Sequence, residues 1–403
     1  MTDMSQRLRE TRRNMARRIV DHIRKGTSDL ADAPMQNDVS VYTDPVRHAA
    51  ERQKLFRETP LVACLSRDLP EKGSYRTFDE TGVPIVIVRG MDGLVRAFLN
   101  ICPHRGARVV RESSGSAKLF TCWFHGWSFD SQGNGVAVPE QDRFGDVLGA
   151  CDHLTAVPAA ERHGIVFVQA SPGSSIDIDA HLGDFGKELA MLELDHAEAV
   201  RSRPIPVKSN WKYALDTYGE GYHFAALHKK TLAPFFRNDI TIYDRFGPHH
   251  RVGFVSRDME AWVSKPESEW GADELGGIHY VFPNTIIFVG SVRPGSRYVT
   301  TFRHFPGEEV GETVTYKTIY APHGVNSPEY RKEVEDAFDA TAHVVETEDY
   351  VTAAEGWRNL TMAPKGSKVT YGRQELALQY QHRAIANAIG MPLPDPARRE
   401  AAE

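Results

Sequence analysis

The chain has 403 residues, a net charge of −6 and four cysteines. Its length exceeds one usual domain and favours two, while the small net charge gives solubility and points to no particular partner. We expect no nucleic-acid partner. No stretch approaches the roughly 18 consecutive apolar residues of a membrane span, and the N-terminus lacks the apolar run of a signal peptide. Four widely spaced cysteines do not make a secreted disulfide framework. We therefore expect a cytoplasmic protein that does not bind membranes.

The N-terminal segment, residues 1–42, is predicted to be helical. Before Gly26 it carries eight Arg or Lys against three acids, and four apolar side chains fall on one helical stripe: Leu8, Met15, Ile19 and Ile23. This pattern predicts an amphipathic helix that ends at Gly26. We expect the helix to pack on its own protein or on a neighbouring subunit, and a membrane-surface or nucleic-acid arm is the alternative.

Residues 43–170 are predicted to form a β-rich domain. The stretch "VPIVIVRGMDGLVRAFLN", residues 83–100, reads strand, Asp-Gly turn, strand, and "SFDSQGNGVAV", residues 128–138, repeats that pattern. A further strand is expected at 163–169. The Pro/Gly/Ser-rich stretch "ASPGSSIDIDA" that follows is the predicted domain boundary.

Residues 171–403 are predicted to form a second, α+β domain. Helical patterns at 183–196, 211–229, 328–355 and 373–389 alternate with strand-like runs such as "GIHYVFPNTIIFVG" and "ETVTYKTIYAP". The chain shows no internal repeat.

Two Cys/His pairs, Cys102-x-His104 and Cys122-x-x-His125, form the first candidate metal site, and we expect each pair at the tip of a hairpin. Thiolate and imidazole are ligands for both zinc and iron–sulfur clusters, so a zinc-binding structural protein is one alternative. Structural zinc sites usually begin with two cysteines and end with two histidines, whereas here each loop brings one of each. Two such loops can hold a binuclear cluster, with the Cys pair on one iron and the His pair on the other, which is the Rieske [2Fe–2S] arrangement.

The segment "NWKYALDTYGEGYHFAALH", residues 210–228, contains the second candidate site. Asp216 and Glu220 precede His223 and His228, and two His plus one carboxylate on one face of iron leave positions open for O2. Residues five apart lie about 140° apart on an ideal helix, which prevents joint ligation. We therefore predict an irregular turn between His223 and His228.

The sequences "CPHRGARV" and "CWFHGW" resemble the Rieske motif of ring-hydroxylating and related oxygenases. The resemblance implies that Cys102, His104, Cys122 and His125 bind a [2Fe–2S] cluster with both histidines on the outer iron. Respiratory Rieske proteins have an additional cysteine in each loop, which this chain lacks, so a low-potential cluster is implied. Cys64 and Cys151 are expected to be buried small side chains.

"NWK…YH…H" resembles the start of the catalytic domain of Rieske oxygenases, in which the histidines bind a mononuclear iron. The resemblance implies His223 and His228 as ligands, and an "ED" dipeptide in a late helix supplies the carboxylate. Asp349 is the choice here, and the alternatives are Asp336, Asp339, Glu346 and Glu348. We expect His249 and His250 to be loop or pocket-rim residues. An acid group of a substrate could meet one of three arginines: Arg237, Arg245 and Arg251.

Glu220 occupies the position where most members of that family have the Asp that links their two metal sites. We expect Glu220 to link them here, with Asp216 as a second candidate catalytic carboxylate. Glu at this position also occurs in members that demethylate or hydroxylate quaternary amines, although the residues around it differ from that group.

The resemblance implies a helix-grip (Bet v 1/START-like) catalytic domain with an antiparallel sheet, and an α3 or α3β3 assembly. A reductase or ferredoxin would pass electrons from NAD(P)H through the cluster to Fe(II), which uses O2 to hydroxylate, dihydroxylate or demethylate an organic, aromatic substrate. The alternatives are a quaternary-amine monooxygenase and, in a different class, an electron-transfer Rieske protein.

Overall fold

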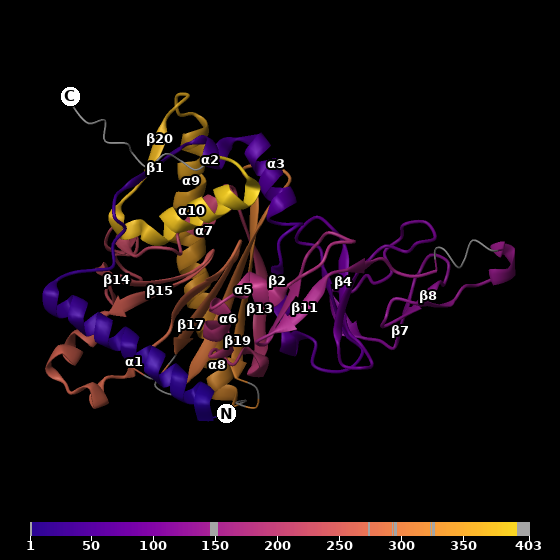
Figure 1. Ribbon diagram of the computed structural model, residues 1–403, viewed down its shortest axis with the longest axis horizontal. Helices are drawn as coiled ribbons and strands as arrows, with labels where there is room; N and C mark the ends of the chain where they lie inside the picture. The colour runs from indigo at the N-terminus through magenta and orange to yellow at the C-terminus, as the bar shows by residue number, and fades with distance from the viewer. Residues whose placement is uncertain are drawn as a thin grey trace. The chain divides into compact units, whose positions relative to one another are not determined.

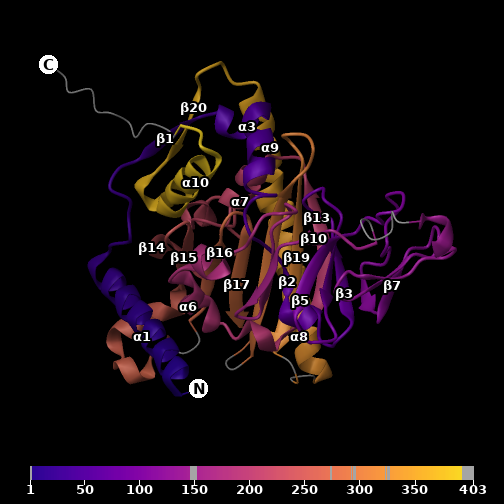
Figure 2. The same ribbon diagram turned by 45° about the vertical axis from the view of Figure 1, so that its right-hand side comes forward.

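The computed structural model describes residues 2–145, 152–272, 275–291, 293, 296–322, 324 and 327–392 (Figure 1, Figure 2). The chain forms two compact units. The small unit comprises Arg52–Leu182 and Leu192–Ala197, and the large unit comprises Met1–Glu51, Gly183–Met191 and Glu198–Glu403. The domain boundaries at 42/43 and 170/171 stay a prediction.

The small unit contains three antiparallel sheets, with strand orders β10-β5-β4-β3-β6, β11-β12-β2 and β7-β8-β9. Its strands are β2 (Leu61–Leu65), β3 (Ser74–Phe78), β4 (Ile85–Arg89), β5 (Val95–Leu99), β6 (Ser114–Ser116), β7 (Leu119–Thr121), β8 (Ser128–Asp130), β9 (Gly135–Ala137), β10 (Ala156–Val157), β11 (Ala159–Arg162) and β12 (Ile165–Val168). Its helices are short: η1 (Ser66–Asp68), η2 (Gln141–Arg143), α5 (Ile178–Leu182) and η4 (Leu194–His196).

The hairpins predicted at 83–100 and 128–138 are confirmed as β4–β5 and β8–β9. Strand β4 has the sequence IVIVR, whose β-branched side chains suit a buried strand, and Gly93 takes the positive φ of +89° that its turn needs. The placement of both Cys/His pairs at hairpin tips is half right. Residues 122–125 connect the paired strands β7 and β8, but residues 102–104 follow β5, which does not pair with the next strand, β6.

The large unit is built on a seven-stranded antiparallel sheet of order β13-β19-β18-β17-β16-β15-β14, with a separate two-stranded sheet, β1-β20. The strands are β1 (Met35–Asp38), β13 (Ala197–Val207), β14 (Phe236–Phe246), β15 (His249–Ser256), β16 (Gly277–Val281), β17 (Thr285–Ser291), β18 (Arg297–Pro306), β19 (Thr313–Pro322) and β20 (Lys368–Tyr371). The helices are α1 (Thr2–Lys25), α2 (Ser40–Thr43), α3 (Pro45–Lys54), α6 (Phe185–Ala190), α7 (Trp211–Asp216), α8 (Pro328–Val344), α9 (Tyr350–Thr361) and α10 (Leu376–Ile389), with the 3-10 helices η5 (Tyr222–Ala225), η6 (Arg257–Ser264), η7 (Glu267–Glu269) and η10 (Arg373–Glu375) and the π-helix η9 (Val345–Asp349).

One face of the seven-stranded sheet holds the helices α8 and α9. Thr315 and Lys317 of β19 point to the same face, because alternate residues of a strand share a face. The Thr315 hydroxyl lies 2.5 Å from the hydroxyl of Tyr350 in α9, and the Lys317 ammonium lies 2.6 Å from the carbonyl oxygen of Phe338 in α8. The α8–η9–α9 rod therefore lies against this face (Figure 1), as expected for a helix-grip domain.

The predicted N-terminal helix is confirmed as α1, which ends where Gly26 takes a φ of +61°. Met15 and Ile19 are buried against Ile240 and Ile242 of β14. The helix thus packs on its own chain, as predicted. In the part of the chain that the structure describes, α1 and the other helices are all too short or too polar to cross a membrane.

Candidate metal centres

The two Cys/His segments of the small unit form loops with the same backbone geometry. In the first, Gly106 N–H donates to the Cys102 carbonyl at 2.9 Å, and Cys102 N–H donates to the Ala107 carbonyl at 2.7 Å. The second loop repeats both bonds at 2.9 and 2.8 Å, from Gly126 N–H to Cys122 O and from Cys122 N–H to Trp127 O. Gly106 and Gly126 have φ of +77° and +76°, which glycine adopts without strain. The Gly after each pair is therefore required by the turn.

Four side chains of these loops bring possible metal ligands together. The thiols of Cys102 and Cys122 are buried beside each other. The His104 and His125 rings lie 4.5 Å apart, and the Nδ1 atom of each is buried without a hydrogen-bond partner in the described structure. Trp127 stacks on His104 at 4.9 Å and fixes its ring plane. Two thiols and two unpartnered imidazole nitrogens fit the donor set of a binuclear iron–sulfur cluster.

Burial sets the protonation of this site. It raises the pKa of the Cys102 thiol and, together with the neighbouring His125, lowers the pKa of His104. The imidazole is therefore neutral at pH 7 and able to accept a metal bond, whereas the thiol requires a cation before it loses its proton.

The second candidate site begins where α7 ends. The predicted helix over 211–229 is regular only from Trp211 to Asp216, and the 3-10 helix η5 (Tyr222–Ala225) and a turn follow. The predicted irregular turn between His223 and His228 is confirmed. It brings the two Nε2 atoms to 3.1 Å from each other, which a continuous helix does not allow.

The third member of this site comes from the π-helix η9 (Val345–Asp349), between α8 and α9. The Asp349 Oδ1 atom lies 3.2 Å from His228 Nε2 and 3.6 Å from His223 Nε2, and it accepts no hydrogen bond in the described structure. Among the described residues, His223, His228 and Asp349 are the one group of three or more His, Cys, Asp or Glu whose ligand atoms converge closely enough for a metal ion.

The other nitrogen of each imidazole is already occupied. His223 Nδ1 donates to Glu220, and His228 Nδ1 donates to Glu348. When both rings are neutral, the two Nε2 atoms are lone-pair acceptors, so three acceptors converge on one point. Such an arrangement is repulsive by itself and is relieved by a cation, which makes the trio a fit for mononuclear iron.

The electrostatics of the trio also favour positive charge. Burial disfavours a charged His223 ring, but Asp349 and Glu220 outweigh burial and raise its pKa to about 9. The pKa of His228 is raised in the same way, against burial, by Asp349 and Glu348. Without a metal, a proton takes the place of the cation.

Known families match both units. Residues 59–160 match the family described as Rieske [2Fe-2S] domain, and residues 194–390 match the family described as Ring hydroxylating alpha subunit (catalytic domain). The two matches appear in the order that the cluster loops and the His/Asp trio take along the chain. The chain belongs to the Rieske non-haem iron oxygenases.

Curated members of the family are distant in sequence. The glycine betaine monooxygenase oxygenase subunit of Chromohalobacter salexigens is 28% identical over 58% of this chain and 52% of its own length. The benzene 1,2-dioxygenase subunit alpha of Pseudomonas putida is 27% identical over 82% of this chain and 80% of its own length. The chain thus spans about half of the first relative and four fifths of the second.

Solved structures of the family share the fold. The quaternary ammonium Rieske monooxygenase CntA gives a TM-score of 0.76 at 21% identity, covering 89% of this chain and 96% of its own. Naphthalene 1,2-dioxygenase from Rhodococcus sp. gives 0.68 at 18% identity, covering 94% and 98%. The predicted α+β fold, a Rieske domain followed by an antiparallel catalytic domain, is confirmed.

The other acidic candidates for the third ligand lie in other contacts. Glu348 contacts His228 Nδ1, on the side of the ring away from the convergence point. The remaining three form ion pairs: Asp336 with Lys332, Asp339 with Arg201 and Glu346 with Arg203. Of the five acids considered, the structure brings Asp349 to both imidazoles.

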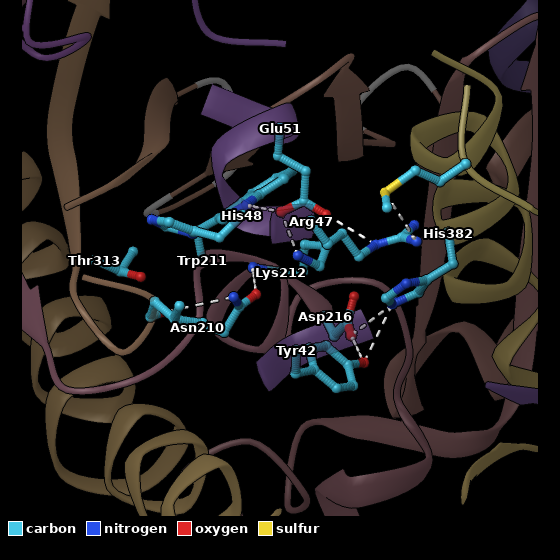
Figure 3. A network of polar contacts seen from close by, with 12 residues as sticks. Tyr42, Arg47, His48, Glu51, Asn210, Trp211, Lys212, Asp216, Thr313 and His382 are labelled. Atoms are coloured by element: carbon cyan, nitrogen blue, oxygen red, sulfur yellow. Dashed lines mark hydrogen bonds and ion pairs between the residues drawn. The ribbon is translucent and has the colours of Figure 1, made fainter. Parts of the chain in front are cut away.

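Asp216 lies in a buried polar cluster. Its Oδ2 accepts from Tyr42 and lies 2.9 Å from His382 Nε2, and its Oδ1 accepts from Gln381 at 3.0 Å. Figure 3 shows Asp216 facing Tyr42 and His382. The structure therefore does not bring Asp216 to the converging trio, and these contacts give it a structural position between α2, α7 and α10.

The adjoining residues of α7 form a buried ion-pair network. Glu51 of α3 accepts from Lys212 Nζ at 2.5 Å, from Trp211 Nε1 at 2.9 Å and from Arg47 Nε at 3.2 Å (Figure 3). Glu51 and Lys212 are 0% and 1% exposed. Asn210 caps α7 by accepting from Lys212 N–H at 3.0 Å. The "NWK" sequence thus anchors the segment that leads to His223, a role that sequence analysis missed.

One expectation about other residues is corrected. His249 and His250 are not loop residues: both are buried in β15, where His249 stacks on Phe185 at 5.0 Å and His250 on Tyr280 at 4.6 Å. The arginines are engaged within the protein: Arg237 with Asp239 and Glu260, Arg251 with Glu188 and Asp244, and Arg245 with the Tyr380 ring. Cys64 is buried as predicted, and Cys151 lies outside the described residues.

Proposed function

We propose that this chain is the terminal oxygenase component of a Rieske system. A separate reductase or ferredoxin supplies electrons from NAD(P)H. The [2Fe–2S] cluster is held by Cys102, His104, Cys122 and His125. Fe(II) is held by His223, His228 and Asp349. When bound, these groups relay electrons and activate O2 for insertion of oxygen into an organic substrate. The protein contributes the ligands, their orientation and a buried setting.

The observation that carries this proposal is the convergence of His223 Nε2, His228 Nε2 and Asp349 Oδ1 in a chain that also has the paired cluster loops. An electron-transfer Rieske protein needs only the loops and has no use for three converging acceptors. A structural zinc protein does not require two separate donor sets. The pair of sites therefore favours an enzyme.

Glu220 is proposed to connect the two centres. It is 8% exposed, and besides the His223 ring it accepts the His223 backbone N–H at 3.1 Å. A carboxylate can accept about four hydrogen bonds, so two of these positions are used and the others can receive His125 of a neighbouring subunit. Through this contact Glu220 holds the His223 tautomer and fixes the path between the cluster and the iron.

The assembly we propose is a head-to-tail ring of three chains, alone or with a β subunit, with residues 43–170 of one chain beside residues 171–403 of the next. A heterologous contact of this kind closes as a ring. A similar structure, of a quaternary ammonium Rieske monooxygenase at 20% identity and TM-score 0.73, is described as revealing inter-subunit electron transfer.

The substrate is proposed to be apolar and aromatic. Phe224 lies 5.0 Å from the His223 ring and 5.6 Å from the His228 ring, and Phe254 lies 5.2 Å from Phe224, so one side of the trio is an aromatic wall. The second candidate is a quaternary amine. Glu220 favours it, and an aromatic wall also accommodates a quaternary ammonium group.

Two experiments test the proposal. A surrogate reductase with NADH should support O2-dependent consumption of at least one of four substrate classes: aromatic acids, aryl ethers, steroids or betaines.

Glu220→Gln should keep both metal centres but slow reoxidation of the reduced cluster in single-turnover mixing with substrate and O2, while Glu260→Gln on the surface should behave as wild type. Reoxidation of Glu220→Gln at the wild-type rate contradicts the role given to Glu220.

A further inference from the structure

The His228 side chain is held more tightly than that of His223. His228 is 1% exposed, and both of its ring nitrogens face carboxylates that are neighbours in sequence. Nε2 lies 3.2 Å from Asp349 Oδ1, and Nδ1 donates to Glu348 Oε2. One imidazole is thus held between consecutive residues of a single helical turn.

An α-helix does not readily produce this contact. Consecutive side chains of an α-helix diverge by about 100°, so two short acidic side chains seldom reach one ring. Here the wider turn of η9, Val345–Asp349, interrupts the rod between α8 and α9. Such single π-turns are rare and occur frequently at functional sites. The turn presents Glu348 and Asp349 to the same imidazole.

Thr231 fixes the position of Glu348. Its hydroxyl donates to the same Oε2 atom at 2.8 Å, from the segment that follows His228. The Glu348 side chain is 21% exposed, so solvent water competes for its carboxylate. The hydrogen bond from Thr231 therefore helps to hold its orientation. Glu346 on the same turn makes no such contact with the imidazoles, because it pairs with Arg203 instead.

We propose that Glu348 is the positioning residue of the mononuclear site: it accepts a hydrogen bond from His228 Nδ1 and thereby holds the ring with Nε2 aimed at the point where Asp349 Oδ1 and His223 Nε2 converge. This inference rests on the proposed function of the trio as an iron site. Glu348 is not itself a ligand, because its oxygen is turned to the far nitrogen of the ring. His223 has a matching partner in Glu220, three residues earlier, whereas His228 takes its partner from the π-turn, 120 residues later.

The test is Fe(II) binding by the full chain with its cluster in place. The mononuclear iron is removed with a chelator and titrated back, and occupancy is followed by iron analysis and by the EPR signal of the nitric oxide adduct. Removal of a partner of a metal-bound histidine typically costs about 10–100-fold in metal affinity. We expect a loss of that size for Glu348→Ala, and a smaller loss for Glu348→Gln, whose amide oxygen still accepts the Nδ1 proton.

Two further variants control the experiment. Glu346→Gln removes an acid from the same π-turn and should bind Fe(II) as wild type does. Thr231→Val should fall between wild type and Glu348→Ala, with a broadened EPR signal, because Glu348 is kept but is less fixed. An unchanged visible spectrum shows that the cluster is intact in each variant.

The outcomes separate the inference from the proposed function. If the wild-type chain takes up no third iron, the proposed function fails. If the wild type binds it and Glu348→Ala binds it equally well, the role of Glu348 is overturned. An equal loss for Glu346→Gln also overturns it, because the effect then belongs to the helix and not to the His228 contact. Should Glu348→Ala not fold, Glu348→Gln and Thr231→Val decide by the same criteria.

Discussion

The two candidate metal sites are built in opposite ways. The cluster loops of the small unit are local: each forms its own turn with two backbone hydrogen bonds, and the donors lie between residues 102 and 125. The trio of the large unit gathers His223 and His228 with Asp349, from elements that meet only when the chain has folded around the sheet.

This difference has an energetic consequence. A turn whose backbone bonds are satisfied within a few residues keeps its shape when distant parts of the protein change. The trio depends on buried charges instead. Glu51 and Lys212 fix α7, and Glu220 and Glu348 fix the two imidazoles. We therefore expect the cluster site to be tolerant of distant substitutions and the trio to be sensitive to them.

The largest expected effect is the loss of the cluster in Cys122→Ser. One of two thiolates is removed, and a hydroxyl does not replace a thiolate on iron. We expect acid-labile sulfide and visible absorption to disappear, while the third iron stays bound at the trio. Iron and sulfide analysis checks this result. Loss of all iron would break the comparison, because the trio would then depend on the cluster.

The next effect is on stability, from Glu51→Gln. Burial lowers the pKa of Lys212, and Glu51 opposes this effect. Without the Glu51 charge the Lys212 ammonium is left without its partner, which costs about 3–5 kcal/mol. Urea unfolding followed by circular dichroism should show this loss of stability. The third iron should also be retained more weakly, while the cluster spectrum is unchanged before unfolding.

The control is Asp21→Asn, which breaks an exposed pair with Lys25 and should cost less than about 1 kcal/mol. Equal effects would show that the buried network has no special role.

A smaller and pH-dependent effect is expected from Lys317→Met. Lys317 is 0% exposed, and burial, reinforced by Arg203, lowers its pKa to about 7 from the usual 10.5. Between these values the unfolded chain binds more protons than the folded chain, so the unfolding free energy of the wild type rises with pH, by about 2 kcal/mol from pH 7 to pH 9. The methionine variant should lack this rise. Parallel urea titrations at the two pH values measure it, and the same rise in both proteins would show that Lys317 is not its source.

The cluster site could be predicted from sequence because its geometry is local. Cys, His and Gly recur within each short loop, and the residues that close each turn are next to the ligands. The hairpins β4–β5 and β8–β9 followed from strand patterns and turn residues for the same reason. The prediction that residues 102–104 lie at a hairpin tip failed, because the sequence pattern does not show which strands pair. These residues follow a strand that does not pair with the next one.

The trio could be predicted only in part. The five-residue spacing of His223 and His228 required a broken helix, which the structure contains. The choice of Asp349 over Glu348 depends on a π-turn, and no residue pattern announces a change from 3.6 residues per turn. Glu51 meets Lys212 across 161 residues, a contact that neither sequence segment specifies. The sequence gives no local sign that His249 and His250 belong to a buried strand, because polar residues in strands are usually exposed.

The most direct test of two separately built metal centres is the iron and acid-labile sulfide content of wild type and His228→Ala, measured on the same preparations. Wild type should hold three irons and two sulfides per chain, because a [2Fe–2S] cluster and one mononuclear iron are bound. His228→Ala should hold two irons and two sulfides and keep its visible spectrum. Three irons in His228→Ala, or zinc without sulfide in the wild type, would contradict the account.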